Sequence, residues 1–116
     1  MAYDPTLLFA EVKVRLQNAP ATSLKALSLS LGVSDRTIQN VVKVKTGKQF
    51  TRLRSDILIE EFRSALQSQP NATIKEMCFS MGYKSLRSFT RAISRSTGVS
   101  PKALRSRIVV DLAIHT

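Results

Sequence analysis

The sequence is short of the residues that cross-link a chain or bind metal. It has one cysteine, one histidine and no tryptophan among 116 residues. Cys78 therefore cannot form a disulfide within the chain. Because Cys78 and His115 are the only cysteine and histidine, no cysteine–histidine zinc site is possible. We expect no metal and no cofactor. A chain without disulfides is typical of a reducing compartment, so the expected location is cytoplasmic.

Glycine, proline and long apolar runs are also scarce. There are four glycines and four prolines, and no stretch alternates between β-branched or aromatic residues and polar ones. This disfavours β-barrels and βαβ folds. No run approaches the roughly 18 apolar residues of a membrane span. The first residues also lack the basic segment of a signal peptide, so no membrane partner is expected.

Negative charge is the third scarcity. Eight acidic residues face eighteen lysines and arginines, which gives a net charge of +10. A hydrophobic fraction of 43% is normal for a folded chain and argues against disorder. The combination predicts a globular protein with a polyanionic partner, nucleic acid first and an acidic membrane surface second.

Apolar residues recur at helical spacing, and capping residues divide the chain into about seven helices. Asp4 and Pro5 open the first, and Leu8, Val12 and Leu16 form its inward stripe. The predicted helices are residues 5–18, 23–32, 34–47, 49–67, 73–82, 85–98 and 100–107. In the long fourth helix the inward positions are Phe50, Leu53, Ile57 and Leu66. The predicted fold class is therefore all-α.

The second half of the chain repeats the first. Residues 73–82 match residues 23–32 at an offset of 50, and residues 97–105 match residues 46–54 at an offset of 51. Each copy has a short helix, a glycine turn and a second helix opened by serine, the pattern of a helix-turn-helix. That motif needs a small residue where its helices cross and a glycine four positions later. Both copies meet this need, with the pairs Ser28 and Gly32, and Cys78 and Gly82.

Three stretches of the second copy carry the most specific pattern. They are residues 77–83 (MCFSMGY), residues 89–91 (FTR), and residues 98–101 (GVSP) followed by Arg105. They are similar to the signature I-A-x-x-x-G-F, F-x-R, G-x-x-P and a final Tyr-Arg of the AraC/XylS family of bacterial transcription regulators. The resemblance covers about residues 23–105. The chain departs from the family at Leu58, commonly arginine, and at Phe62, commonly alanine, so we expect the packing between the two units to differ.

The resemblance implies two homeodomain-like three-helix subdomains with a long linker helix between them. The expected divisions are residues 1–49, 50–67 and 68–107, with a tail at 108–116. This tail has three open interpretations: it continues the last helix over the core, it is a docking segment, or it is an added segment without a role in the fold.

The resemblance also implies a sequence-specific DNA-binding transcription regulator, with activation favoured over repression. The implied partners are double-stranded DNA and RNA polymerase. The chain has the length of the small members of the family that lack a sensor domain. The alternative within the family is the DNA-binding part of a longer, ligand-sensing regulator.

The outward positions of the two second helices are the candidate DNA contacts. Arginine can bind guanine through two hydrogen bonds, and glutamine or asparagine can bind adenine in the same way. The residues expected at base edges are Arg36, Gln39, Asn40, Arg87, Thr90 and Arg91. The residues expected at phosphates are Ser34, Lys43, Lys84, Ser85, Arg95 and Lys102.

Positive charge is concentrated in the second copy. Residues 84–107 hold seven basic residues and no acidic one. Within them Arg87, Arg91 and Arg95 are spaced four residues apart, and like charges at that spacing destabilise an isolated helix. This stripe predicts an anion beside the helix.

The linker helix sets the expected distance between the second helices of the two motifs, which we call the recognition helices. Eighteen residues span roughly 27 Å, close to one turn of DNA, which is about 34 Å. Two recognition helices could then enter successive major grooves, so we expect one chain to read a bipartite, asymmetric site as a monomer.

Two hypotheses from other classes remain. A membrane-surface protein would need a broad apolar face opposite the charge, and binding to vesicles but not to duplex would support it. A cysteine methyl acceptor would need an exposed, activated Cys78, and rapid labelling of the native thiol would support it. Because Cys78 is expected at the buried helix crossing, a structural role is the stronger interpretation.

Overall fold

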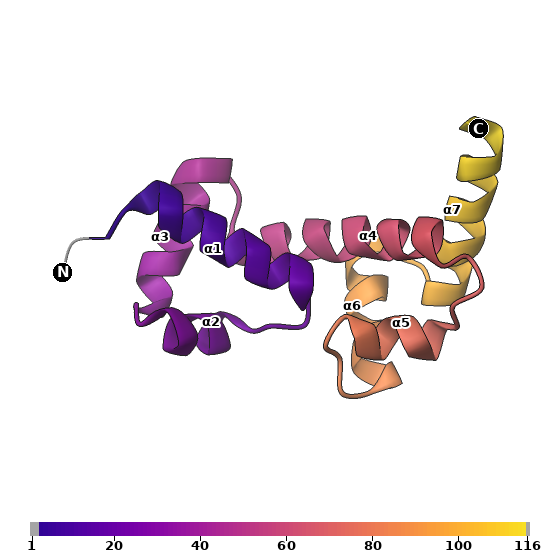
Figure 1. Ribbon diagram of the computed structural model, residues 1–116, viewed down its shortest axis with the longest axis horizontal. Helices are drawn as coiled ribbons and strands as arrows, with labels where there is room; N and C mark the ends of the chain where they lie inside the picture. Colours follow the sequence, from indigo (N-terminus) through magenta and orange to yellow (C-terminus); the bar gives the residue numbers. More distant parts are fainter. Residues whose placement is uncertain (1–2, 116) are drawn as a thin grey trace.

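The computed structural model describes residues 3–115, which form seven helices and no strand. The all-α prediction is confirmed. The first three helices gather around one end of α4 and the last three around the other (Figure 1). The molecule is elongated, with extents of 48 × 30 × 24 Å. The helices are α1 (Pro5–Asn18), α2 (Leu24–Leu31), α3 (Asp35–Thr46), α4 (Phe50–Ser68), α5 (Ile74–Ser80), α6 (Leu86–Thr97) and α7 (Pro101–His115).

Side-chain caps fix where most of these helices begin. The Asp4 carboxylate accepts hydrogen bonds from the backbone N–H groups of Thr6 and Leu7 at 2.9 and 3.3 Å. At α5, Thr73 and Glu76 form a reciprocal capping box. These caps satisfy N–H groups that have no partner inside the helix. The predicted helix starts therefore agree with the structure to within a residue or two.

Two hydrophobic cores share α4. The first core takes Phe50, Leu53 and Ile57 from the first half of α4, and the second takes Leu58, Phe62 and Leu66 from its second half. The other members of the first core are Leu8, Val12, Leu16, Leu27, Ile38, Val41 and Val42. The other members of the second are Met77, Cys78, Met81, Phe89, Ile93, Leu104 and Ile108. The helix is therefore part of both units as well as the link between them.

The internal repeat extends further than the helix-turn-helix motifs. The buried α1 stripe at positions 8, 12 and 16 recurs 50 residues later at 58, 62 and 66. Positions 50, 53 and 57 at the start of α4 recur 51 residues later at 101, 104 and 108, all buried in α7. Leu58 and Phe62, where the chain departs from the family, therefore occupy the positions of Leu8 and Val12 inside the second core.

The last helix is longer than predicted. Its expected end near Arg107 is wrong, because α7 continues to His115. Ile108 is buried in the second core and Leu112 packs against it. An ion pair between Arg63 Nη1 and Asp111 Oδ2, at 3.1 Å, also joins α7 to α4. Of the interpretations of the tail, the structure supports continuation of the helix over the core.

The two units touch through their loops as well as through α4. The Ala21 N–H donates to the Met81 carbonyl at 3.2 Å. Gly82, at φ +88°, lies so close that an added Cβ would be 3.3 Å from the Ala19 Cβ. This contact fixes the turn of the second unit against the loop between α1 and α2. No helix within residues 3–115 is both long and apolar enough to cross a membrane.

Candidate nucleic-acid interface

The helix pairs α2–α3 and α5–α6 have matching turns. Ser28 and Cys78 are buried where the helices of each pair cross. Their carbonyls accept hydrogen bonds from the N–H groups of Val33 and Tyr83, both at 3.2 Å. Gly32 and Gly82 have left-handed φ angles of 68° and 88°. The four residues expected to shape the turns thus occupy equivalent places in the two units.

Helix α3 separates an apolar inner face from a polar outer face. Ile38, Val41 and Val42 are buried in the first core. The residues predicted to read bases, Arg36, Gln39 and Asn40, are all exposed. The fold of the first unit therefore leaves these side chains available to a partner.

Helix α6 has the same organisation with more charge. Phe89 and Ile93 are fully buried, while Arg87, Arg91 and Arg95 are exposed and Thr90 is half-buried. No ion pair within residues 3–115 involves any of the three arginines. Arg36, Gln39 and Asn40 correspond to Arg87, Thr90 and Arg91 at the repeat offset of 51. The predicted base-reading residues are thus equivalent positions of two repeated helices.

Some residues predicted at phosphates also have structural tasks. The Ser34 and Ser85 hydroxyls cap α3 and α6, accepting from the N–H groups of Thr37 and Ser88, both at 3.1 Å. Lys43 donates from Nζ to the carbonyl of Gly47 at 3.1 Å, beside the end of α3. Lys84, Arg95 and Lys102 are exposed.

Two hollows border α3 and α6. The larger, of about 650 Å³, lies between α4 and α6 and is lined by Arg91 and Arg95 among others. The smaller, of about 520 Å³, lies between α3 and α4 and is lined by Gln39, Asn40 and Lys43 among others. Five predicted contact residues therefore border these hollows, whereas Arg36, Arg87 and Thr90 line neither of them.

Sequence reasoning missed the residues that α4 contributes to these hollows. Thr51 and Arg54 line both, and Arg52 lines the larger. The sequence contained a signal for one of them, because Arg54 is the repeat equivalent of Arg105, a residue of the family signature. Each donates from Nη1 to an equivalent carbonyl, Thr22 for Arg54 and Ala72 for Arg105.

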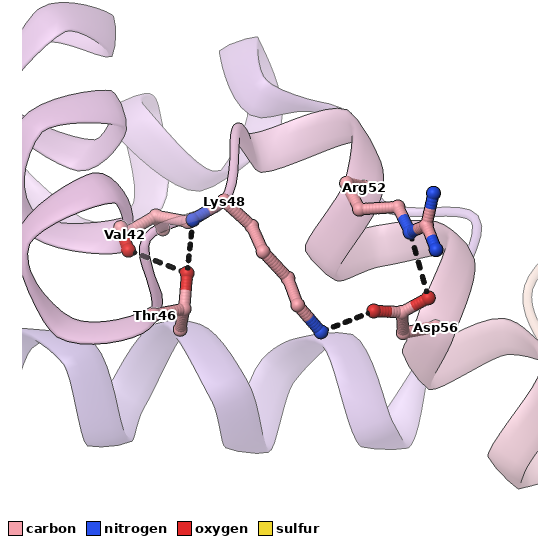
Figure 2. Close-up of polar contacts among 5 residues, drawn as sticks. All are labelled: Val42, Thr46, Lys48, Arg52 and Asp56. Atoms are coloured by element: carbon pink, nitrogen blue, oxygen red, sulfur yellow. Dashed lines mark hydrogen bonds and ion pairs between the residues drawn. The ribbon is translucent and has the colours of Figure 1, made fainter.

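One carboxylate, Asp56, holds two cations at the edge of the larger hollow (Figure 2). Lys48 Nζ lies 2.6 Å from Asp56 Oδ2, and Arg52 Nε lies 3.2 Å from Oδ1. The hydrogen bond from Lys48 is the main cause of the lowered pKa of the Asp56 carboxyl.

The loop that carries Lys48 is itself fixed. The Lys48 N–H donates to Thr46 Oγ1 at 3.0 Å, and that hydroxyl donates to the Val42 carbonyl at 2.7 Å (Figure 2). The cluster around Asp56 therefore ties the end of α3 to α4.

The single thiol is enclosed. Cys78 is fully buried, and its Sγ lies 3.4 Å from the Ser85 carbonyl. Burial raises the pKa of the Cys78 thiol. A raised pKa disfavours the thiolate, whereas a methyl acceptor would need an exposed, activated cysteine.

Comparisons with known proteins agree with this geometry. Residues 27–107 match the family described as "Helix-turn-helix domain". The chain belongs to the AraC-type helix-turn-helix family. It is 32% identical over 69 residues to the HTH-type transcriptional regulator YobQ of Bacillus subtilis (strain 168). That alignment covers 60% of this chain and 28% of the relative.

A solved structure shares the fold. The C-terminal domain of AraT, a response regulator from Geobacillus stearothermophilus, aligns with a TM-score of 0.69 at 23% identity. The alignment covers 86% of this chain and 84% of that one. The all-α fold of this chain therefore occurs in a solved structure.

The residues that carry the AraC-type signature hold the second unit together. The Tyr83 ring packs edge-on against Phe89 with centroids 5.3 Å apart. Arg105 donates from Nη2 to the Pro70 carbonyl at 2.7 Å and from Nη1 to that of Ala72, which joins α7 to the loop before α5. Tyr83 and Arg105 therefore have structural contacts, whereas Arg91, which ends the FTR stretch, is exposed on α6 and is one of the residues predicted to contact DNA.

Proposed function

We propose that the chain is a sequence-specific DNA-binding transcription regulator that inserts α3 and α6 into successive major grooves. The observation that carries the proposal is the equivalence of two polar sets on repeated helices, exposed except for the half-buried Thr90. Arg36, Gln39 and Asn40 occupy in α3 the positions of Arg87, Thr90 and Arg91 in α6. Membership of a helix-turn-helix family supports the groove assignment, since the second helix of that motif enters the major groove.

Residue type determines which base each side chain suits. Arg36, Arg87 and Arg91 suit guanine, and Gln39 and Asn40 suit adenine, each good pair contributing about 1–3 kcal/mol of discrimination. Thr90 is also placed at a base edge in this proposal. The phosphate contacts in this proposal are Ser34, Lys43, Lys84, Ser85, Arg95 and Lys102, which position the protein without reading sequence.

The length of α4 supports binding by a single chain. Its 19 residues span roughly 28 Å, close to the pitch of B-DNA, about 34 Å. One chain then covers two half-sites about one turn apart. The two half-sites differ because the two polar sets differ, so the preferred site is asymmetric and the bound protein is a monomer.

Three finer parts of the proposal rest on the family rather than on geometry. They are activation rather than repression, contact with RNA polymerase and a cytoplasmic location. The matched relative YobQ is by its name a transcriptional regulator, and this chain spans 28% of its length. The alternative within the family, the DNA-binding part of a longer ligand-sensing regulator, therefore stands beside the proposal.

Selection of bound duplexes from a random pool tests the proposal. We expect enrichment of one bipartite, asymmetric motif with half-sites about one helical turn apart. The complex should contain one chain per duplex. A pool that shows no enrichment after repeated rounds would overturn sequence-specific binding, and a palindromic motif bound by two chains would overturn the monomer.

A further inference from the structure

Arg54 lies where the two hollows beside the recognition helices meet. Thr51 and Arg54 are the residues that line both. One hollow carries Arg91 and Arg95 of α6, and the other carries Gln39 and Asn40 of α3. Because the first half of α4 lines both hollows, it lies between α3 and α6. A DNA duplex that contacts both of these helices therefore passes beside it.

The bonding of Arg54 differs from that of its repeat equivalent. Arg105 is held by two loop carbonyls, those of Ala72 and Pro70. Arg54 keeps one such bond, a long one of 3.4 Å from Nη1 to the Thr22 carbonyl, and its guanidinium lies 6.0 Å from the centre of the Phe50 ring. A guanidinium has five N–H donors, so most donors of Arg54 have no hydrogen-bond partner within residues 3–115.

The charges around Arg54 favour the binding of an anion. Four arginines and one carboxylate line the larger hollow. That carboxylate, Asp56, is already bound to Lys48 and Arg52, and no ion pair in the described part of the chain includes Arg54. The hollow therefore has a surplus of positive charge at the point where both concave surfaces join.

We infer that Arg54 binds a phosphate group of the DNA backbone in the segment between the two half-sites. The inference rests on the proposed function, because it needs a duplex lying across both recognition helices. A guanidinium matches a phosphate group through two parallel hydrogen bonds. This contact would add affinity and hold the spacing of the two half-sites without reading a base.

A double-mutant cycle between protein and DNA tests the inference. The selected duplex is made with ordinary phosphates or with neutral methylphosphonate linkages in the segment between the half-sites, and binding is measured by fluorescence anisotropy. We expect Arg54→Ala to lower affinity for the ordinary duplex about tenfold, the loss of one charge-assisted hydrogen-bonded pair. On the neutral duplex the same substitution should have little further effect. Arg54→Lys should keep part of the coupling, because it keeps the charge.

Arg105→Ala is the matched control. It removes the equivalent loop anchor from the second unit, so it should lower the melting temperature and show no coupling to the neutral linkages. If Arg54→Ala also only lowers the melting temperature, and neither Arg54 variant couples to the linkages, the inference is overturned and Arg54 is a loop anchor. An Arg54→Ala loss that depends on the bases of the spacer rather than on its phosphates would also overturn it.

The proposed function fails by a different result. If the wild-type chain binds no duplex, both the function and the inference fall. If the wild type binds and Arg91→Ala weakens that binding while Arg54→Ala does not, only the inference falls.

Discussion

At the scale of single residues, the exposed face of α6 is defined by three arginines at intervals of four. Their placement was predictable, because Phe89 and Ile93 fix the inner face and each arginine is two residues from one of them, which places it on the opposite face of the helix. Like charges at this spacing cost helix stability unless an anion lies beside them. The stripe therefore supports the proposal that α6 binds an anionic partner.

Arg91 and Lys102 are expected to contribute to binding in different ways. Arg91→Ala should weaken binding to the selected duplex by about 1–3 kcal/mol and relax the preference at one base pair. Lys102→Ala should weaken binding to selected and random duplexes equally, because a phosphate contact carries no sequence information. Equilibrium titrations of both variants on both duplexes make the comparison. Equal losses for Arg91→Ala on the two duplexes would contradict its role in reading a base.

Other single residues could not be assigned from the sequence. A hydroxyl such as Ser34 or Ser85 can cap a helix or bind a phosphate, and the structure places both in caps. Arg54 was missed because α4 has two buried stripes. Ile57 and Leu58, one residue apart, belong to different cores, so a single inward stripe fitted to this helix misassigns the residues between the two faces.

At the scale of elements, α4 and α7 show how far the repeat reaches. The first half of α4 closes the first core as α7 closes the second, and the second half of α4 does for the second core what α1 does for the first. The motif residues alone do not predict the structure of the tail after Arg107, because the family resemblance ends near Arg105. Alignment of Ile57 with Ile108 at the same offset predicts a longer last helix.

Ile108 tests whether the end of α7 is part of the second core. It is 2% exposed, whereas Val110 on the same helix is 58% exposed. Ile108→Ala should lower the free energy of unfolding by about 2–5 kcal/mol, from lost burial and the cavity left behind. Val110→Ala should change it by less than about 0.5 kcal/mol. Urea denaturation of both variants measures the difference, and similar small losses would mean that α7 contributes little beyond Arg107.

Gly82 tests the contact between the two units. Both Gly82 and Gly98 have left-handed φ angles, so alanine at either position should cost roughly 1–2 kcal/mol of strain. An alanine Cβ at Gly98 would meet no atom within 4 Å, whereas one at Gly82 would press on Ala19. Gly82→Ala should therefore destabilise the protein more than Gly98→Ala in chemical denaturation, and weaken binding to the bipartite duplex further. Equal effects of the two substitutions would show that the loop contact does not hold the units together.

At the scale of the whole molecule, net charge and shape act together. The composition indicated a polyanion but could not say where it binds, because the charges come together only when both units fold around α4. The fold places exposed cations on α3 and α6 and a further set along the hollow beside α4. Family and fold class were predictable from repeat and motif, and the same pattern indicates which two helices we propose to read bases. The hollow was not, because its walls come from four separate segments.

The salt dependence of binding measures how much of this charge meets phosphate. If about six phosphates are neutralised, log K should fall with log salt concentration at a slope of about −5. Titrations at several salt concentrations give the slope. Removing one phosphate contact, as in Lys102→Ala, should reduce its magnitude by about one. A slope near zero would contradict an electrostatic grip on the backbone.

The central claim is that one chain reads two successive major grooves through helices held at a fixed distance. Its most direct test is the affinity for the selected site after insertion of about five base pairs, half a helical turn, between the half-sites. Because α4 is a single helix packed into both cores, the second recognition helix cannot follow its half-site to the opposite face of the duplex. The affinity should fall to that of a duplex carrying one half-site. An unchanged affinity would contradict the account.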